Sequence, residues 1–177
     1  MYTDELSDLL VKGLKSAASA VLSKYGDEDI YILSLEADDS SFDGGFSFTL
    51  YVNTEENHAR RVAEAEKDSR SGADPWYYRF CEYEWYIEAE PEELNEAAEF
   101  INNGYATFDA ATIYECIVSA VEKLRAEKYF ESVFPHNIFF AINASEEFEP
   151  DEMIEFAVRM NGRENCADYI DNADSFL

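Results

Sequence analysis

The chain has 177 residues, of which 47% are hydrophobic and 15% aromatic, enough apolar material for the core of a single domain spanning residues 1–177. Thirteen lysines and arginines stand against 39 aspartates and glutamates, which gives a formal net charge of −26. A charge of this sign argues against direct binding of nucleic acid or of an anionic membrane surface, and it favours association with basic proteins.

The N-terminal segment and the cysteines indicate a cytoplasmic protein. The segment that begins Met1-Tyr2-Thr3 has neither a basic region nor an apolar run, so it does not resemble a signal peptide. No stretch approaches the ~18 apolar residues of a membrane span. Cys81, Cys116 and Cys166 are far apart and odd in number, which is typical of reduced thiols.

The first half of the chain reads as a helix, two strands and a second helix. Apolar residues recur at helical spacing over residues 4–25, after a possible cap at Thr3. Residues 30–35 are almost continuously apolar, which is typical of a buried central strand, and residues 46–53 alternate as a half-buried strand does. Turn residues lie between them, so the two strands are expected to form a hairpin. Thr54 can cap a helix that runs through about Ser69.

The second half predicts two more strands among helices. Alternation over residues 82–90 predicts a strand, and Pro91 suits the start of a helix ending near Asn103. Asp109 can cap a helix, residues 138–142 read as a buried strand, and Pro150 opens a helix to about Met160. Residues from about 172 onward are expected to be loose. This order predicts an α+β fold with a mainly antiparallel sheet of about four strands covered by helices.

The aromatic and acidic segment around residues 76–90 is the candidate interaction site. If residues 82–90 form one strand, an acidic face with a tyrosine at its centre results, next to an aromatic rim. Tyrosine and tryptophan are frequent binding hot spots. The alternative is that the acids only keep an edge strand soluble and that the aromatic residues belong to the core. The predicted contact residues are Glu82, Glu84, Tyr86, Glu88, Glu90, Trp76 and Tyr77.

The sequence predicts no catalytic residue, no metal and no cofactor. The only histidines are His58 and His136, and nothing places either beside a cysteine. Adjacent glycines occur once, before a strand, so a phosphate-binding loop is not indicated. Residues 39–44 imitate the start of a calcium-binding loop, but Leu50 stands where that loop needs a bidentate glutamate. Paired carboxylates for glycoside chemistry stay open, because acids are too abundant to be informative.

Several short motifs resemble one bacterial family, the domain of unknown function 4303. They are the strand and acidic turn Ile30 to Asp39, the junction Val52-Asn53-Thr54-Glu55-Glu56, the aromatic Tyr83-Glu84-Trp85, the strand Ile138 to Asn143, and the helix end Met160-Asn161. The acidic residue usual after the late strand appears only as Ser145-Glu146-Glu147. The resemblance brings no established catalytic residues, and it favours an immunity protein, because similar small acidic proteins often have that role beside bacterial toxins.

Three functions follow as hypotheses. The first is a non-catalytic acidic protein that binds a basic protein partner, such as a toxin domain that it neutralises. The second is a nucleic-acid mimic that inhibits a DNA-binding protein. The third is an enzyme whose site is assembled from residues distant in the sequence, for example Cys81 or Cys116 with a histidine.

Overall fold

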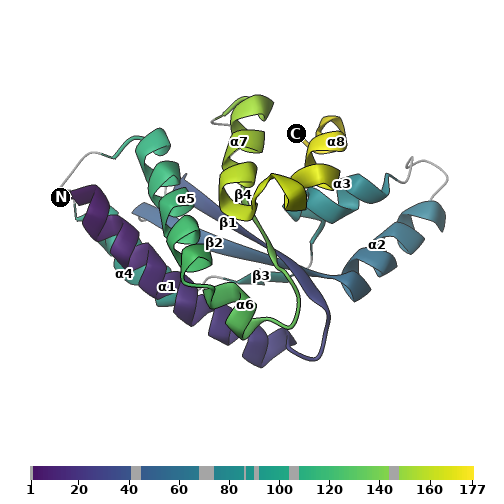
Figure 1. The fold of residues 1–177 in the computed structure, drawn as a ribbon, viewed down its shortest axis with the longest axis horizontal. Helices are drawn as coiled ribbons and strands as arrows, with labels where there is room; N and C mark the ends of the chain where they lie inside the picture. Colours follow the sequence, from purple (N-terminus) through teal and green to yellow (C-terminus); the bar gives the residue numbers. More distant parts are fainter. Residues whose placement is uncertain are drawn as a thin grey trace.

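The computed structural model describes residues 2–40, 45–67, 74–85, 87–89, 92–103, 108–143 and 148–177. Two consecutive strands follow the first helix, and groups of helices separate them from the remaining two strands (Figure 1). The elements are α1 Tyr2–Tyr25, β1 Ile30–Ser40, β2 Gly45–Thr54, α2 Glu55–Lys67, α3 Pro75–Phe80, η1 Glu82–Glu84, β3 Ile87–Ala89, η2 Glu92–Leu94, α4 Asn95–Asn102, α5 Ala110–Ala126, α6 Tyr129–Val133, β4 Phe139–Asn143, α7 Pro150–Asn161, η3 Arg163–Cys166, α8 Ala167–Asp171 and η4 Ala173–Ser175. The α+β fold predicted from the sequence is confirmed.

The sheet is mixed, with the strand order β3-β2-β1-β4. β1 and β2 form the expected antiparallel hairpin, in which Leu35 pairs with Leu50. β3 is also antiparallel to β2, whereas β4 runs parallel to β1, with Leu33 opposite Phe140. The prediction of a mainly antiparallel sheet therefore holds for two pairings and is wrong for the third, because the long helical connection returns β4 in the direction of β1.

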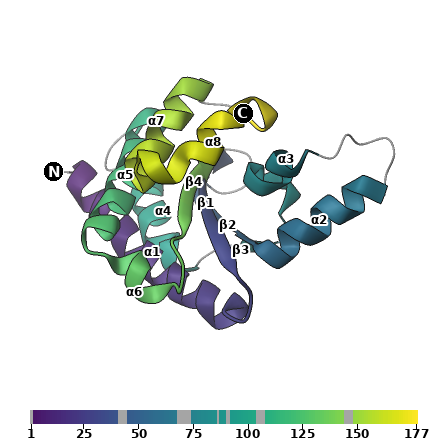
Figure 2. The same ribbon diagram turned by 45° about the vertical axis from the view of Figure 1, so that its right-hand side comes forward.

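One face of the sheet is covered by α1, α4 and α5, as Figure 2 shows on the left of the strands. The reason lies in the sequence of α1, where buried apolar residues recur every three or four positions. Leu6, Leu10 and Leu14 are at most 2% exposed. They meet the alternating residues Leu50 and Val52 of β2, so this face holds the larger core.

The second face carries a smaller core made by short elements. Phe80 of α3 lies at its centre, with its ring centroid 5.2 Å from Tyr169 and 5.1 Å from Phe176. Tyr169 belongs to α8, and Phe176 and Leu177 follow η4. The expectation that residues from about 172 are loose is wrong, because their aromatic and apolar side chains pack on this core.

Two asparagines at helix ends bind the backbone of strands. Asn161, the last residue of α7, accepts from the Phe140 amide (2.7 Å) and donates to the Phe140 carbonyl (2.8 Å). Asn102, the last residue of α4, accepts from the Phe46 amide (2.6 Å) and donates to its carbonyl (2.9 Å). Each carboxamide therefore satisfies both polar groups of one strand residue, as a neighbouring strand does.

The continuous strand predicted over residues 82–90 is wrong in its first part. Glu82–Glu84 form a 3-10 turn, and among the described residues of this stretch it is Ile87–Ala89 that pair with β2. The amide of Trp85 donates to the Glu82 carbonyl (2.9 Å), a local bond that an extended strand cannot make. The two faces expected from the alternation therefore do not exist at Glu82 and Glu84.

Candidate functional site

A hydrogen-bonded network joins the start of β1 to the end of β2 and to α3. The Tyr31 phenol accepts from Asn53 Nδ2 (2.8 Å) and donates to the Arg79 carbonyl (2.9 Å). Asn53 Oδ1 in turn accepts from Asn57 Nδ2 (2.7 Å). Asn53 is fully buried and Asn57 nearly so, and these bonds satisfy amides that would otherwise be costly to bury.

The guanidinium of Arg79 lies on this network. It forms two parallel bonds to the Glu55 carboxylate, at 3.1 Å and 2.8 Å, and its central carbon lies 4.2 Å from the Tyr31 ring centroid. The bond from Arg79 holds the pKa of Glu55 below its usual range. Burial opposes the charge of Arg79, but the pairing with Glu55 outweighs it and raises the pKa of Arg79. Both groups are therefore charged at neutral pH.

A pocket of about 330 Å³ opens beside Arg79; we call it the Arg79 pocket. Its wall is aromatic and apolar, formed by Phe80, Ile138 and Phe139 together with Tyr31. Charged and polar groups stand at its rim, and these are Asp29, Glu55, His136, Asn137, Asn165 and Asp168. The pocket lining thus holds three carboxylates and one guanidinium, so the pocket attracts a cation when His136 is neutral.

A second polar cluster lies on the same face of the sheet, around Glu36 of β1. The Glu36 carboxylate accepts from the Tyr51 hydroxyl (2.7 Å) and from Asn143 Nδ2 (3.2 Å). Glu82 lines a small cavity of about 50 Å³ that Asn143 also lines. Burial raises the pKa of Glu82 to about 7, and the charge of Glu36 adds to the rise. This cavity is small for any substrate larger than water.

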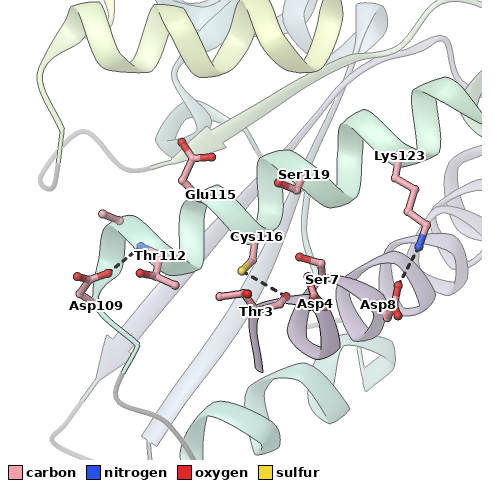
Figure 3. A pocket seen from close by; sticks show the side chains of 11 residues that line it. Thr3, Asp4, Ser7, Asp8, Asp109, Thr112, Glu115, Cys116, Ser119 and Lys123 are labelled. Atoms are coloured by element: carbon pink, nitrogen blue, oxygen red, sulfur yellow. Dashed lines mark hydrogen bonds and ion pairs between the residues drawn. The ribbon is translucent and has the colours of Figure 1, made fainter. Parts of the chain in front are cut away.

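A groove of about 570 Å³ runs between the N-terminal part of α1 and the stretch of α5 from its cap at Asp109 to Lys123 (Figure 3). Its carboxylates have local tasks: Asp109 caps α5 by accepting from the Thr112 amide (2.8 Å), and Asp8 pairs with Lys123 (2.8 Å). Cys116 also lines the groove, and burial raises the pKa of its thiol. A thiol in that state is a poor nucleophile, so the groove offers polar contacts rather than chemistry.

The structure separates the residues predicted to form an acidic ribbon. Glu82 is turned partly inward, as described above, and Glu84 pairs with Arg61, whose Nε also donates to the Glu84 carbonyl (3.2 Å). The side chains of Tyr86, Glu88 and Glu90 lie outside the described residues. Whether any of these residues contacts a partner stays a prediction.

The predicted aromatic rim lies on α3. The Trp76 ring stacks on Phe80, with centroids 6.1 Å apart, and is half-buried, so Trp76 belongs in part to the smaller core. Tyr77 is half-buried against Tyr78. A hydrogen bond to Cys81, with burial, raises the pKa of Tyr77 to about 12. The α3 helix therefore brings Trp76 close to the Arg79 pocket, which Phe80 lines.

The candidate nucleophiles and bases have structural partners. Burial raises the pKa of the Cys166 thiol, which donates to the Ala157 carbonyl (3.3 Å). His58 Nε2 lies 2.9 Å from the Pro75 carbonyl, and His136 Nε2 lies 3.4 Å from Asp29 Oδ1. Within the described residues, no three acid, histidine or cysteine side chains are arranged to hold a metal ion. Ser41, Asp43 and Gly44 of the calcium-loop imitation lie outside those residues.

Sequence reasoning did not identify the Arg79 pocket. Its residues come from five separate stretches of the chain, and Arg79 lies 24 positions from Glu55. One signal was available, since Glu55 belongs to the junction motif after β2 and Arg79 is the single basic residue in the aromatic run of residues 76–80. In the described part of the chain, none of the helices has the length and apolar character that crossing a membrane requires.

Comparison with known proteins identifies a family. No curated protein and no solved structure matches the chain. The family described as Domain of unknown function (DUF4303) matches residues 10–162, a stretch that holds both halves of the hydrogen-bonded network and the Glu36 cluster. That match covers most of the chain, and the chain therefore belongs to the DUF4303 family.

Proposed function

We propose that this chain is a non-catalytic protein that binds a basic protein through its acidic surface, in the manner of an immunity protein that neutralises a basic toxin domain. The proposal is supported by how charges are distributed between paired and unpaired groups. Electrostatic attraction between an acidic surface and a basic protein raises the rate of association and makes the binding sensitive to salt.

The observation that carries the proposal concerns the C-terminal part of the chain. Basic side chains pair with carboxylates of the chain itself at Lys12, Lys15, Arg60, Arg61, Arg79, Lys123, Arg125 and Arg159. Exposed carboxylates of α7, α8 and their flanks form no ion pair with any cation of the described residues. They are Asp151, Glu152, Glu155, Glu164, Asp168, Asp171 and Asp174. This unpaired acidic surface is available to cations of another molecule.

The test is the capture of a partner from native lysate at two salt concentrations, about 50 mM and about 300 mM. The higher concentration screens the attraction between charges on the two proteins more strongly. The wild type is compared with the triple variant Asp151→Asn, Glu152→Gln, Glu155→Gln. The matched control changes the exposed Glu5, Glu92 and Glu99 to Gln, which removes the same charge from α1, η2 and α4. A second variant, Glu84→Gln with Glu88→Gln and Glu90→Gln, tests the residues predicted from the sequence.

We expect a basic protein that the wild type and the control capture at low salt and that is lost from the α7 variant or at higher salt. The captured protein is then expressed in bacteria. If it inhibits growth and co-expression of this chain relieves the inhibition, this chain neutralises it. Capture of a DNA-binding protein that nucleic acid displaces supports mimicry instead. Equal capture by all variants contradicts the acidic surface proposed here.

A further inference from the structure

The Arg79 pocket has the shape and chemistry of a site for one long cationic side chain. Its volume of about 330 Å³ exceeds what water alone needs and lies at the lower end of ligand pockets. The wall at Phe80 and Phe139 is aromatic, and the Ile138 side chain, 1% exposed, closes its apolar part. An alkyl stem can pack there while its charged end stays near the rim.

The rim holds carboxylates that no cation of the described chain occupies. Glu55 is taken, because both of its oxygens bind Arg79. Asp168 adds to the field that raises the pKa of Arg79, yet it forms no ion pair within the described residues. Asp29 is exposed, and its partner is His136, which carries charge only when protonated. Asp29 and Asp168 thus leave the pocket with excess negative charge.

These acceptors suit an ammonium better than a guanidinium. Arginine binds best where one carboxylate offers both oxygens in a plane, and the carboxylate that does so here already holds Arg79. The remaining acceptors are separate groups on different elements: Asp29 before β1, Asp168 on α8 and Asn165 on η3. An ammonium carries three rotatable donors and can reach separate acceptors around it.

We propose that the Arg79 pocket receives a lysine side chain of the basic partner, with the stem against Phe80 and Phe139 and the ammonium between Asp29 and Asp168. The inference rests on the proposed function and names the contact through which it acts. It places recognition at the edge where β1 and β4 begin, beside Trp76 of the aromatic rim predicted from the sequence.

The test uses the whole protein and a tetralysine peptide, whose binding is followed by ¹H–¹⁵N correlation spectra at about 50 mM salt. We expect saturable shifts centred on the amides of Ile138, Phe139 and Asn165. The double variant Asp29→Asn, Asp168→Asn weakens the apparent affinity by about tenfold or more, as the loss of two facing charges implies. The matched control Glu5→Gln, Glu99→Gln removes the same charge from exposed positions on α1 and α4, and it keeps the wild-type affinity within about twofold.

A second variant separates shape from charge. Asn137→Trp places a bulky ring at the rim of the pocket without changing any charge, and it is expected to weaken tetralysine to the same degree. Dispersed spectra and an unchanged thermal midpoint show that each variant is folded. Shifts spread evenly over the acidic surface, or equal losses in the control, overturn the proposal. Tetraarginine that binds more tightly at the same amides overturns the assignment to lysine.

The proposed function fails in a different way. If tetralysine binds in the pocket but no salt-sensitive protein is captured from lysate, the basic partner is contradicted while the lysine site stands. If a basic partner is captured equally by the wild type and by the Asp29→Asn, Asp168→Asn variant, the partner stands and the pocket is not its contact.

Discussion

Asn161 binds both backbone polar groups of Phe140, so one side chain takes the place that a neighbouring strand would occupy beside β4. Since β4 is the last strand of the sheet, its outer side would otherwise present an unpaired amide and carbonyl. The Asn161 carboxamide also reaches Arg125 (3.0 Å) and the Ala157 carbonyl (2.9 Å), which fixes its orientation.

Replacing Asn161 is expected to be costly. Asn161→Ala leaves the buried amide and carbonyl of Phe140 without partners, so the free energy of unfolding should fall by about 2–4 kcal/mol. Urea denaturation followed by circular dichroism measures the loss. The control Asn165→Ala removes a single part-buried bond to the Asn161 carbonyl, for which we expect a loss of about 1 kcal/mol. Equal losses would show that the bond pair to Phe140 has no special weight.

Gly45 is expected to resist substitution for two separable reasons. Its φ of +107° is strained for any residue with a side chain, and a Cβ would lie 2.5 Å from Asn102 Oδ1, which binds the Phe46 amide. Gly162 also has a positive φ, of +77°, but a Cβ there meets nothing within 4 Å. Gly162→Ala should cost about 1 kcal/mol and Gly45→Ala about 2–3 kcal/mol, measured by the same denaturation. A Gly45→Ala protein no weaker than Gly162→Ala would remove the contact with Asn102 from the explanation.

Glu82 should make stability fall as pH rises towards neutrality. Its pKa of about 7 in the folded protein exceeds its ordinary value, so the folded state holds the proton over a range where the unfolded chain has released it. Between about pH 4.5 and pH 7 the free energy of unfolding should therefore lose about 2–3 kcal/mol through this group.

The variant Glu82→Gln isolates that contribution from the self-repulsion of the whole acidic chain. Unfolding free energies of the wild type and the variant are compared at pH 5 and pH 8. The variant should gain about 2–3 kcal/mol relative to the wild type at pH 8, and little at pH 5. Glu84→Gln, which breaks the pair with Arg61, is the control and should lose stability at pH 8. A Glu82→Gln difference that is the same at both pH values contradicts the raised pKa.

Arg79 is expected to contribute more than an exposed ion pair. Arg79→Lys keeps the charge but loses the second bond to Glu55 and the stacking on Tyr31, so we expect a loss of about 1–2 kcal/mol. Lys12→Ala removes an exposed pair with Glu96 and should cost less than about 0.5 kcal/mol. Chemical denaturation at low and high salt distinguishes the two, because screening weakens only the exposed pair strongly.

Patterns of local origin were predicted well. The alternation of β2 correctly placed Phe48, Leu50 and Val52 in the core, since a strand turns successive side chains to opposite faces. Asp109 caps α5, and Pro150 stands at the start of α7, because both residues act through the backbone of their own turn.

Features that depend on distant residues could not be predicted. The alternation around Glu82 fits two structures equally well: one continuous strand, or a 3-10 turn followed by a short strand. Only the packing of Phe80 and Trp85 on the second face of the sheet decides between them. The Arg79 pocket needs α8 beside the start of β1. Nothing in the sequence around Asp168 or Asp29 indicates that α8 lies beside the start of β1.

The smaller core has a consequence for synthesis on the ribosome. Phe80 and Phe139 are made before the rings of Tyr169 and Phe176 that cover them, which come from the stretch after the family match. Until residues 163–177 leave the exit tunnel, this face of the nascent sheet shows aromatic surface to water. The acidic net charge of the growing chain then acts as its own protection, since like-charged chains repel each other before their aromatic faces can meet.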